Sequence, residues 1–168
     1  MVEIGDRAPL VTAPMATPEH AGHRGEYTAE HVEPFDLGVA LESGPVVLAF
    51  FPGVHSRTCT EELCHLRDWH RGLADLDAGV YGVSVDTPWS QLAFIDEHDL
   101  SYPLVSAFES DVLTEYGLRR EEGPLAGIAE RAVFVVDTDW SVTYRWVVRE
   151  PQVFPDLGAV ADAVAEAG

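Results

Sequence analysis

The run Val46–Phe51 (VVLAFF) is continuously apolar and is closed on both sides by a proline, Pro45 and Pro52. A strand covered on one face alternates apolar and polar residues, and this run does not alternate. A short uninterrupted apolar run between turn residues is typical of a central strand that is buried on both faces. The run therefore predicts a sheet with helices packed on each side.

Strand and helix patterns alternate through the rest of the chain. Helices are expected at Thr58 to about Leu73, about Trp89 to His98, Asp111–Tyr116 and Gly158–Ala165, and strands at Gly79–Val85, Tyr102–Val105, Ala132–Val136 and Val142–Val148. This alternation indicates a parallel sheet, and the turn sequence at 137–141 adds a hairpin that makes the sheet mixed. The order is that of the thioredoxin fold. We therefore expect an α/β protein with a thioredoxin-like fold, in which helices cover both faces of a mixed central sheet.

The length of 168 residues suits one domain, and no repeat or linker divides the sequence. We expect a single domain over residues 1–168. Residues 11–33 are rich in Pro, Thr, His, Gly and Glu and predict an irregular N-terminal segment. Residues 118–130 likewise predict a loop.

The charge balance is unusual. The chain has 29 acidic and 10 basic residues, a formal net charge of -19, and every basic residue is an arginine. A dispersed acidic surface repels itself in dilute buffer and is tolerated where salt screens it, with a Debye length of about 3 Å at 1 M. We therefore expect a halophilic protein, the alternative being an ordinary acidic one. Because the sequence has no basic stripe, nucleic acid is not expected as a partner.

No segment predicts contact with a membrane. The longest apolar run, Val46–Phe51, is far too short to span a bilayer. The opening sequence MVEIGDRAPL lacks the basic region and apolar core of a signal peptide. We therefore expect a cytoplasmic protein.

Cys59 and Cys64 are the only cysteines of the chain. In a cytoplasmic protein of this size, such a pair favours redox or catalytic use over a structural crosslink. His55, His65 and His70 lie near the two cysteines, but the sequence has no CxxC or HxxxH ligand pair. We therefore expect no metal site and no cofactor.

Cys59 stands at the predicted start of the helix that follows the buried strand. Thr58 and Glu61 fit a capping box, which places Cys59 at the first helical position. The unpaired N–H groups and the positive end of the helix dipole favour the thiolate there. This is also the carboxyl end of a central strand, where open α/β sheets usually place their chemistry. The core stripe of the helix, on the side of Cys59, is expected to consist of Leu63, Leu66 and Leu73.

Cys64 lies five residues after Cys59. That spacing corresponds to about 140° around an ideal helix and to a Cα separation of roughly 8 to 9 Å. A disulfide needs less than about 7 Å. The two cysteines therefore cannot bond within an intact helix, and a disulfide requires its first turns to unwind. The alternative for each cysteine is a small buried hydrophobe, and nothing local activates Cys64.

Several residues around Cys59 form a recognisable pattern. They are Phe50-Phe51-Pro52, Ser56, Cys59, Thr60, Glu62 and Leu66-Arg67-Asp68. The pattern resembles the active-site segment of the peroxiredoxin family, which reads Pro, three residues, Thr or Ser, two residues, Cys. The opening Gly5-Asp6-Arg7-Ala8-Pro9 and Arg131, directly before the strand AVFVVD, also look like family features. A second cysteine at Cys64 is similar to the arrangement in the peroxiredoxin Q or bacterioferritin-comigratory group.

The resemblance implies a role for each matched residue. Cys59 would be the peroxidatic cysteine that attacks the peroxide, and Cys64 the resolving cysteine that forms an intramolecular disulfide with it. Ser56 would hydrogen-bond the thiolate and the peroxide, and Pro52 would shield the pocket from water. Arg131 would stabilise the thiolate and the developing charge on oxygen. Glu62 would orient Arg131.

The resemblance also implies the reaction and its partners. The protein would reduce hydrogen peroxide and organic hydroperoxides, with a thioredoxin- or glutaredoxin-like reductant restoring the thiols. It would be a monomer or a homodimer.

Two positions depart from the family pattern. Ser56 stands where the family usually has threonine, and His55 stands where a large apolar residue is common. His55 is either a pH-sensitive neighbour of the thiolate or a surface histidine. Two other functions stay open: a thioredoxin-like disulfide oxidoreductase, which usually carries CxxC, and a non-enzymatic redox sensor.

Overall fold

A computed structural model describes residues 1–72, 77–148 and 153–167. The apolar run forms β3 (Val46–Phe50), in which every residue is buried, as predicted. β3 pairs in parallel with β4 (Gly79–Ser84) and antiparallel with β6 (Arg131–Val136). Full burial follows because neighbouring strands flank β3 on each side and helices cover both of its faces.

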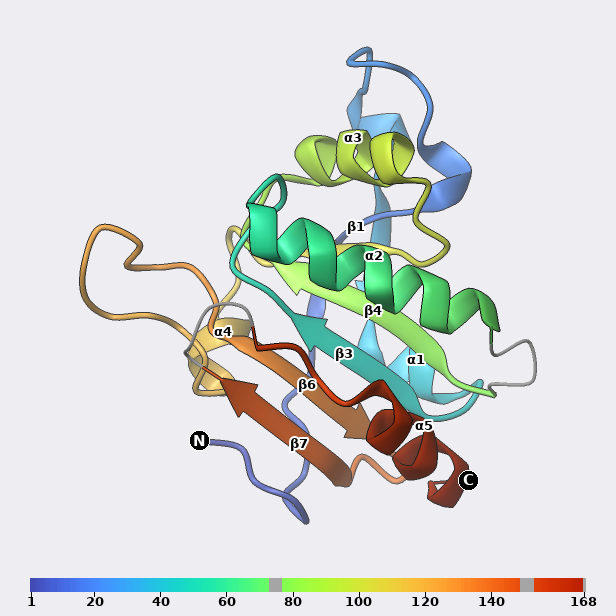
Figure 1. Cartoon of the computed structure of the whole chain (residues 1–168), viewed down its shortest axis with the longest axis vertical. Helices are drawn as coiled ribbons and strands as arrows, with labels where there is room; N and C mark the ends of the chain where they lie inside the picture. Colours follow the sequence, from blue (N-terminus) through green and yellow to red (C-terminus); the bar gives the residue numbers. More distant parts are fainter. Residues whose placement is uncertain (73–76, 149–152, 168) are drawn as a thin grey trace.

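Seven strands form one mixed sheet in the order β2-β1-β5-β4-β3-β6-β7, shown in Figure 1. The remaining strands are β1 (Thr12–Ala16), β2 (Glu33–Asp36), β5 (Leu104–Ser106) and β7 (Val142–Val148). β3, β4 and β5 run parallel to one another, and β6 with β7 is the predicted hairpin. The expected α/β class with a mixed sheet is confirmed.

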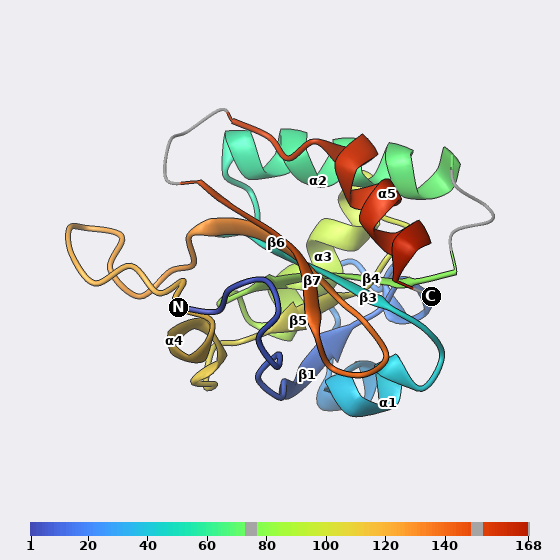
Figure 2. The ribbon, with the colours of Figure 1, turned by 90° about the horizontal axis from the view of Figure 1, so that it is seen from below.

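Helices pack on both faces of the sheet, and Figure 2 shows α2 and α5 on the side opposite α1. Their bounds are α1 (Leu37–Leu41), α2 (Arg57–Gly72), α3 (Pro88–His98), α4 (Val112–Glu115) and α5 (Leu157–Glu166). One core cluster lies under α2, α3 and α5, and a second lies under α1 and α4. Leu63 and Leu66 are buried in the first cluster as predicted, whereas Leu73 falls outside the described residues.

The expectation of an irregular segment over 11–33 is wrong for its first part, because residues 12–16 form β1. Between β1 and β2 lie two short 3-10 turns. Pro14 and Pro34 are unfavourable residues for a strand, since proline cannot donate to a ladder. In the sheet the two prolines face each other, and β1 meets β5 only through Met15 and Ala16. Pro14 therefore lies outside the β1–β5 pairing.

Residues 118–130 form a long excursion before β6 that extends away from the sheet in Figure 1. Its two arms approach each other at an isolated bridge between Arg119 and Ala129. The Arg120 N–H donates to the Ile128 carbonyl at 2.9 Å, and the Gly127 N–H donates to the Arg120 carbonyl at 2.7 Å. The predicted loop is thus a hairpin-like arm with defined backbone bonds. Among the helices of the described ranges, none is long and apolar enough to cross a membrane.

Candidate active site

The loop between β3 and α2 sets the start of the helix. α2 begins at Arg57, one residue earlier than predicted, and Ser56 caps it. The Cys59 N–H donates to the Ser56 Oγ at 3.2 Å, and the Thr60 N–H donates to the Ser56 carbonyl at 2.9 Å. The predicted Thr58–Glu61 capping box is therefore wrong, because Thr58 is already the second residue of α2 and the helix is capped by Ser56, two residues earlier. Cys59 is the third helical residue and still lies in the first turn.

Arg131 is brought to Cys59 by the sheet. It is the first residue of β6, and β6 runs antiparallel to β3, so the beginning of β6 lies beside the end of β3. Its Nη2 lies 3.6 Å from the Cys59 Sγ, although 72 residues separate the two in sequence. Cys59 has no exposed surface and Arg131 is 6% exposed. In this setting a guanidinium favours a negative charge on sulfur, because water does not screen the pair.

Glu62 completes the group from the same helix. It follows Cys59 by almost one helical turn, and its Oε2 binds the Nη1 of Arg131. The two side chains are 4% and 7% exposed. Burial raises the pKa of Glu62 from 4.5 to about 7, against the opposing effect of the charge and hydrogen bond of Arg131. The sequence-based prediction that Cys59, Glu62 and Arg131 share one site agrees with this geometry.

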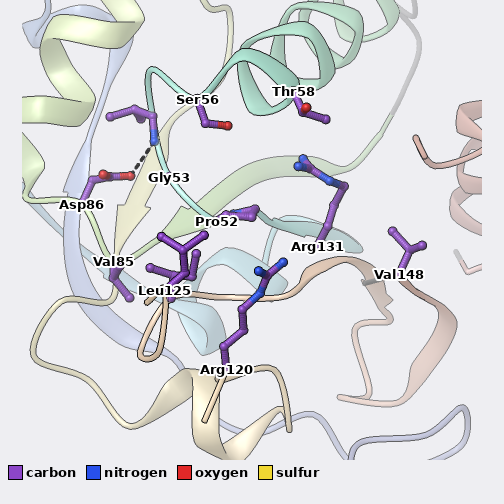
Figure 3. A pocket seen from close by; sticks show the side chains of 12 residues that line it. Pro52, Gly53, Ser56, Thr58, Val85, Asp86, Arg120, Leu125, Arg131 and Val148 are labelled. Atoms are coloured by element: carbon purple, nitrogen blue, oxygen red, sulfur yellow. Dashed lines mark hydrogen bonds between the residues drawn. The ribbon is translucent and has the colours of Figure 1, made fainter. Parts of the chain in front are cut away.

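A cavity of about 480 Å³ opens beside this group, and Figure 3 shows its lining. Pro52, Ser56 and Arg131, which the sequence had singled out, all line it. The other lining residues are Gly53, Val54, Thr58, Val85, Asp86, Arg120, Leu125, Ile128 and Val148. Cys59 itself does not line the cavity, but a small molecule in this space would meet Ser56 and Arg131, and the Arg131 guanidinium lies 3.6 Å from the Cys59 sulfur.

Asp86 supports the loop from the opposite wall and was not predicted as a site residue. Its Oδ2 accepts hydrogen bonds from the Val54 N–H at 2.9 Å and from the Ser84 hydroxyl at 2.6 Å. Asp86 thus ties the loop after β3 to the end of β4. Its position directly after a central strand was the available signal, because carboxyl ends of parallel strands meet at one edge of the sheet. From the sequence, Asp86 had been interpreted only as part of the signal that starts the next helix.

Arg120, Leu125 and Ile128 were missed for a different reason. They reach the cavity from the arm at 118–130, whose course the sequence does not specify. No local motif marks them. Only the pairing of that arm with itself places their side chains at the cavity.

Cys64 lies on the same uninterrupted helix as Cys59 and is partly buried. Both cysteines are free thiols. Since α2 is continuous from Arg57 to Gly72, the spacing argument applies, and the two sulfurs cannot bond while the helix is intact.

His55 lies outside the group of Cys59, Glu62 and Arg131. Its side chain is 52% exposed, its Nδ1 lies 3.8 Å from the Glu97 Oε2, and its ring packs edge-on against Phe94. Its backbone has a positive φ of 68°, which turns the chain into the Ser56 cap. The position therefore fits the surface alternative.

Comparison with known proteins agrees with this geometry. A sequence model of the AhpC/TSA family matches residues 4–145. A Mycobacterium tuberculosis protein named as a peroxiredoxin is 37% identical over 111 residues, which cover 65% of this chain and 71% of that protein. Peroxiredoxin Bcp of Bacillus subtilis is 30% identical over 148 residues, covering 86% and 85% of the two chains.

The same relationship is seen in three dimensions. The crystal structure of peroxidoxin BcpB from Mycobacterium tuberculosis superposes with a TM-score of 0.74 at 29% identity, over 98% of this chain and 96% of that one. The thioredoxin-like fold expected from the sequence is thereby confirmed. The chain therefore belongs to the AhpC/TSA family: it is a peroxiredoxin, a thiol-dependent peroxidase.

Proposed function

We propose that Cys59 is the peroxidatic cysteine and that Cys64 resolves it. The observation that carries the first half is the contact of Arg131 with both the Cys59 sulfur and Glu62 in a site without exposed sulfur surface. The Cys59 thiolate attacks one peroxide oxygen, so that an S–O bond forms and the O–O bond breaks. The second oxygen leaves as an alkoxide or hydroxide and takes up a proton. Sulfur loses two electrons and the peroxide gains them.

Arg131 and Ser56 have distinct tasks in this step. Arg131 balances the thiolate and then the charge that develops on the leaving oxygen. Ser56 caps the Cys59 N–H with its oxygen, and its own hydroxyl proton remains available for the peroxide. Pro52 lines the same cavity and limits the access of water.

In the second step, the sulfenic acid of Cys59 condenses with the Cys64 thiol to give a disulfide and water. An external dithiol then reduces the disulfide by exchange and becomes a disulfide itself. We assign this role to a thioredoxin- or glutaredoxin-like protein, as peroxiredoxins generally use.

The contacts of α2 support a way for this disulfide to form. The second half of the helix is held by side chains that all meet residues 98–102. The Tyr102 hydroxyl donates to the Leu63 carbonyl at 2.7 Å, Arg67 and Arg71 donate to the carbonyls of His98 and Asp99, and His70 Nδ1 lies 2.8 Å from the Ser101 hydroxyl.

The first turns of α2 have different restraints. They depend on the Ser56 cap and on the contacts of Arg131 with Cys59 and Glu62. Oxidation of Cys59 alters one of these contacts directly. We therefore propose that residues 57–62 unwind while residues 63–72 stay in place, which carries the Cys59 sulfur to Cys64.

The experiment is intact-mass analysis of three proteins after one equivalent of hydrogen peroxide in high-salt buffer. Wild type is expected to lose about 2 Da as the disulfide forms, and Cys64→Ser to gain oxygen on Cys59. Cys59→Ser is expected to keep its mass. Oxygen on Cys59 in wild type without a disulfide would show that Cys64 does not resolve it. An unreactive Cys59 would refute the whole assignment.

A further inference from the structure

The cavity beside Cys59 is much larger than hydrogen peroxide requires. Its volume is about 480 Å³. A water molecule takes up about 30 Å³ in the liquid, and hydrogen peroxide has only one oxygen more. Cavities of several hundred cubic ångströms are the size that encloses organic ligands. The space therefore fits a hydroperoxide with a substantial organic group.

Most of the cavity wall is apolar. The side chains that provide it are Val54, Val85, Leu125, Ile128 and Val148. Leu125 is 54% exposed, so an organic group in the cavity would remove apolar surface of this side chain from water. An organic group placed here would bury apolar surface on both partners.

Arg120 provides a positive charge in this apolar wall. Figure 3 shows its side chain rising from the arm toward Pro52. Its backbone is fixed by the two bonds to Ile128 and Gly127, and its Nε lies 3.3 Å from the Glu130 Oε2. Within the part of the chain that the structure describes, its two terminal nitrogens donate to no protein acceptor. The guanidinium thus forms an ion pair with Glu130 through its Nε, which makes no hydrogen bond, and its side chain lines the cavity.

The opposite wall carries a negative charge. The Asp86 carboxylate already accepts hydrogen bonds from Val54 and Ser84 and has no need of a further donor. An anionic group in the cavity is repelled by Asp86 and attracted by Arg120, and the planar guanidinium matches a carboxylate in shape. In a chain with a net charge of -19, such a local cation is what an anion needs in order to bind.

We propose that this site selects organic hydroperoxides that carry a carboxylate, and that Arg120 recognises that group. The inference rests on the proposed function, because the peroxide end must reach Cys59 and Arg131. The carboxylate takes no part in the chemistry. The O–O bond breaks and Cys59 is oxidised as described above, and the product is the corresponding hydroxy acid.

The test compares two substrates that differ by the negative charge and one methyl group: cumene hydroperoxide bearing a para carboxylate, and the methyl ester of the same compound. The second-order rate constant of Cys59 oxidation is measured for each. Wild type is expected to prefer the acid by about tenfold, the size of one charge-assisted hydrogen-bonded contact. Arg120→Gln is expected to bring the ratio close to one. Arg120→Lys keeps the positive charge but lacks the planar guanidinium with its paired donors, so it is expected to prefer the acid less strongly than wild type does.

Arg119→Gln is the matched control. Arg119 precedes Arg120 on the same arm, is 43% exposed, pairs with Glu121 and does not line the cavity. It makes the same change in net charge and is expected to keep the wild-type ratio. A wild-type ratio of one, or equal losses in Arg119→Gln and Arg120→Gln, would overturn the inference.

The reaction of wild type with hydrogen peroxide, measured in parallel, distinguishes a failure of the role of Arg120 from a failure of the role of Cys59. If hydrogen peroxide oxidises Cys59 while the acid and the ester react equally, only the role of Arg120 is refuted. If it leaves Cys59 unreacted, the peroxidatic assignment fails and the inference about Arg120 fails with it.

Discussion

Glu62 holds one terminal nitrogen of Arg131 while the other lies 3.6 Å from the Cys59 sulfur. Both terminal nitrogens of the planar guanidinium are thus engaged, and the side chains of Arg131 and Glu62 are almost fully buried. One guanidinium therefore connects the Cys59 sulfur to a carboxylate on the same helix, so the position of Glu62 affects the orientation of Arg131 toward the sulfur.

Removing the guanidinium of Arg131 should slow the reaction of Cys59 with peroxide. Arg131→Ala is expected to cost about 2 to 4 kcal/mol of transition-state stabilisation, the size of one lost oxyanion donor. Arg131→Lys is expected to recover only part of this, because an ammonium cannot hold Glu62 and the sulfur in the same geometry. Stopped-flow rates of Cys59 oxidation measure both. A wild-type rate in Arg131→Ala would remove Arg131 from the mechanism.

The raised pKa of Glu62 has a consequence for stability. The folded protein holds a proton that the unfolded chain releases near pH 4.5, so the stabilisation from this group is complete below that pH and is lost as the pH rises through about 7. Wild type is therefore expected to lose stability relative to Glu62→Gln over this range. Urea unfolding between about pH 4 and about pH 8 measures the difference.

Glu61→Gln is the control for this titration, since Glu61 is the neighbouring carboxylate and its side chain is half exposed. Its stability curve should run parallel to that of wild type. If Glu62→Gln also runs parallel, Glu62 does not titrate in this range.

Loss of the helix cap should affect both stability and rate. Ser56→Ala removes the acceptor of the Cys59 N–H and is expected to cost about 0.5 to 2 kcal/mol, whereas Ser56→Thr should retain the cap. Ser110→Ala removes a similar contact, with the Val112 N–H at the start of α4, away from the cavity. The two alanine variants should lose comparable stability, and only Ser56→Ala should oxidise more slowly. Equal oxidation rates would limit Ser56 to capping.

The proposed unwinding should be visible in hydrogen exchange. On formation of the disulfide, amides of residues 57–62 are expected to lose protection, while those of residues 66–72 keep it because their side chains remain bound to residues 98–102. Reduced and oxidised wild type are compared, with Cys64→Ser as the form that cannot close the disulfide. Uniform loss of protection along α2 would contradict a boundary at Leu63.

The acidic composition predicts a dependence on salt. With a net charge of -19 and no lysine, the folded state should gain stability from molar KCl, which shortens the Debye length to about 3 Å. Melting temperatures in KCl and in sucrose of equal osmolality separate screening from solute exclusion. The same melting temperature at low and high KCl would leave the chain an ordinary acidic protein.

The features that depend on local sequence patterns, the buried strand and the helix that follows it, could be predicted. A short uninterrupted apolar run between two prolines is typical of a buried strand, and the helix pattern that follows places Cys59 near a helix start. Arg131 was found through family resemblance, because nothing in its own surroundings points to a residue on another strand. The helix cap was misplaced by two residues, since Thr58 and Glu61 have the more familiar spacing while Ser56 lies where the chain turns at His55.

Long-range placement was not predictable. β1 was missed because the composition of residues 11–33 is that of an irregular segment, and Pro14 is accommodated in a strand because it lies outside the β1–β5 pairing. Arg120 and Leu125 depend on how the arm at 118–130 folds back on itself. Asp86 depends on the neighbouring strand ending at the same edge as β3.

The antiparallel pairing of β3 with β6 also affects the order in which a growing chain acquires activity. Cys59 is synthesised 72 residues before Arg131, and the two meet only when β6 has joined the sheet. Until then the thiol lacks the guanidinium. In a nascent or incompletely folded chain Cys59 therefore has no contact with Arg131, and completion of the sheet is the event that assembles the proposed catalytic group.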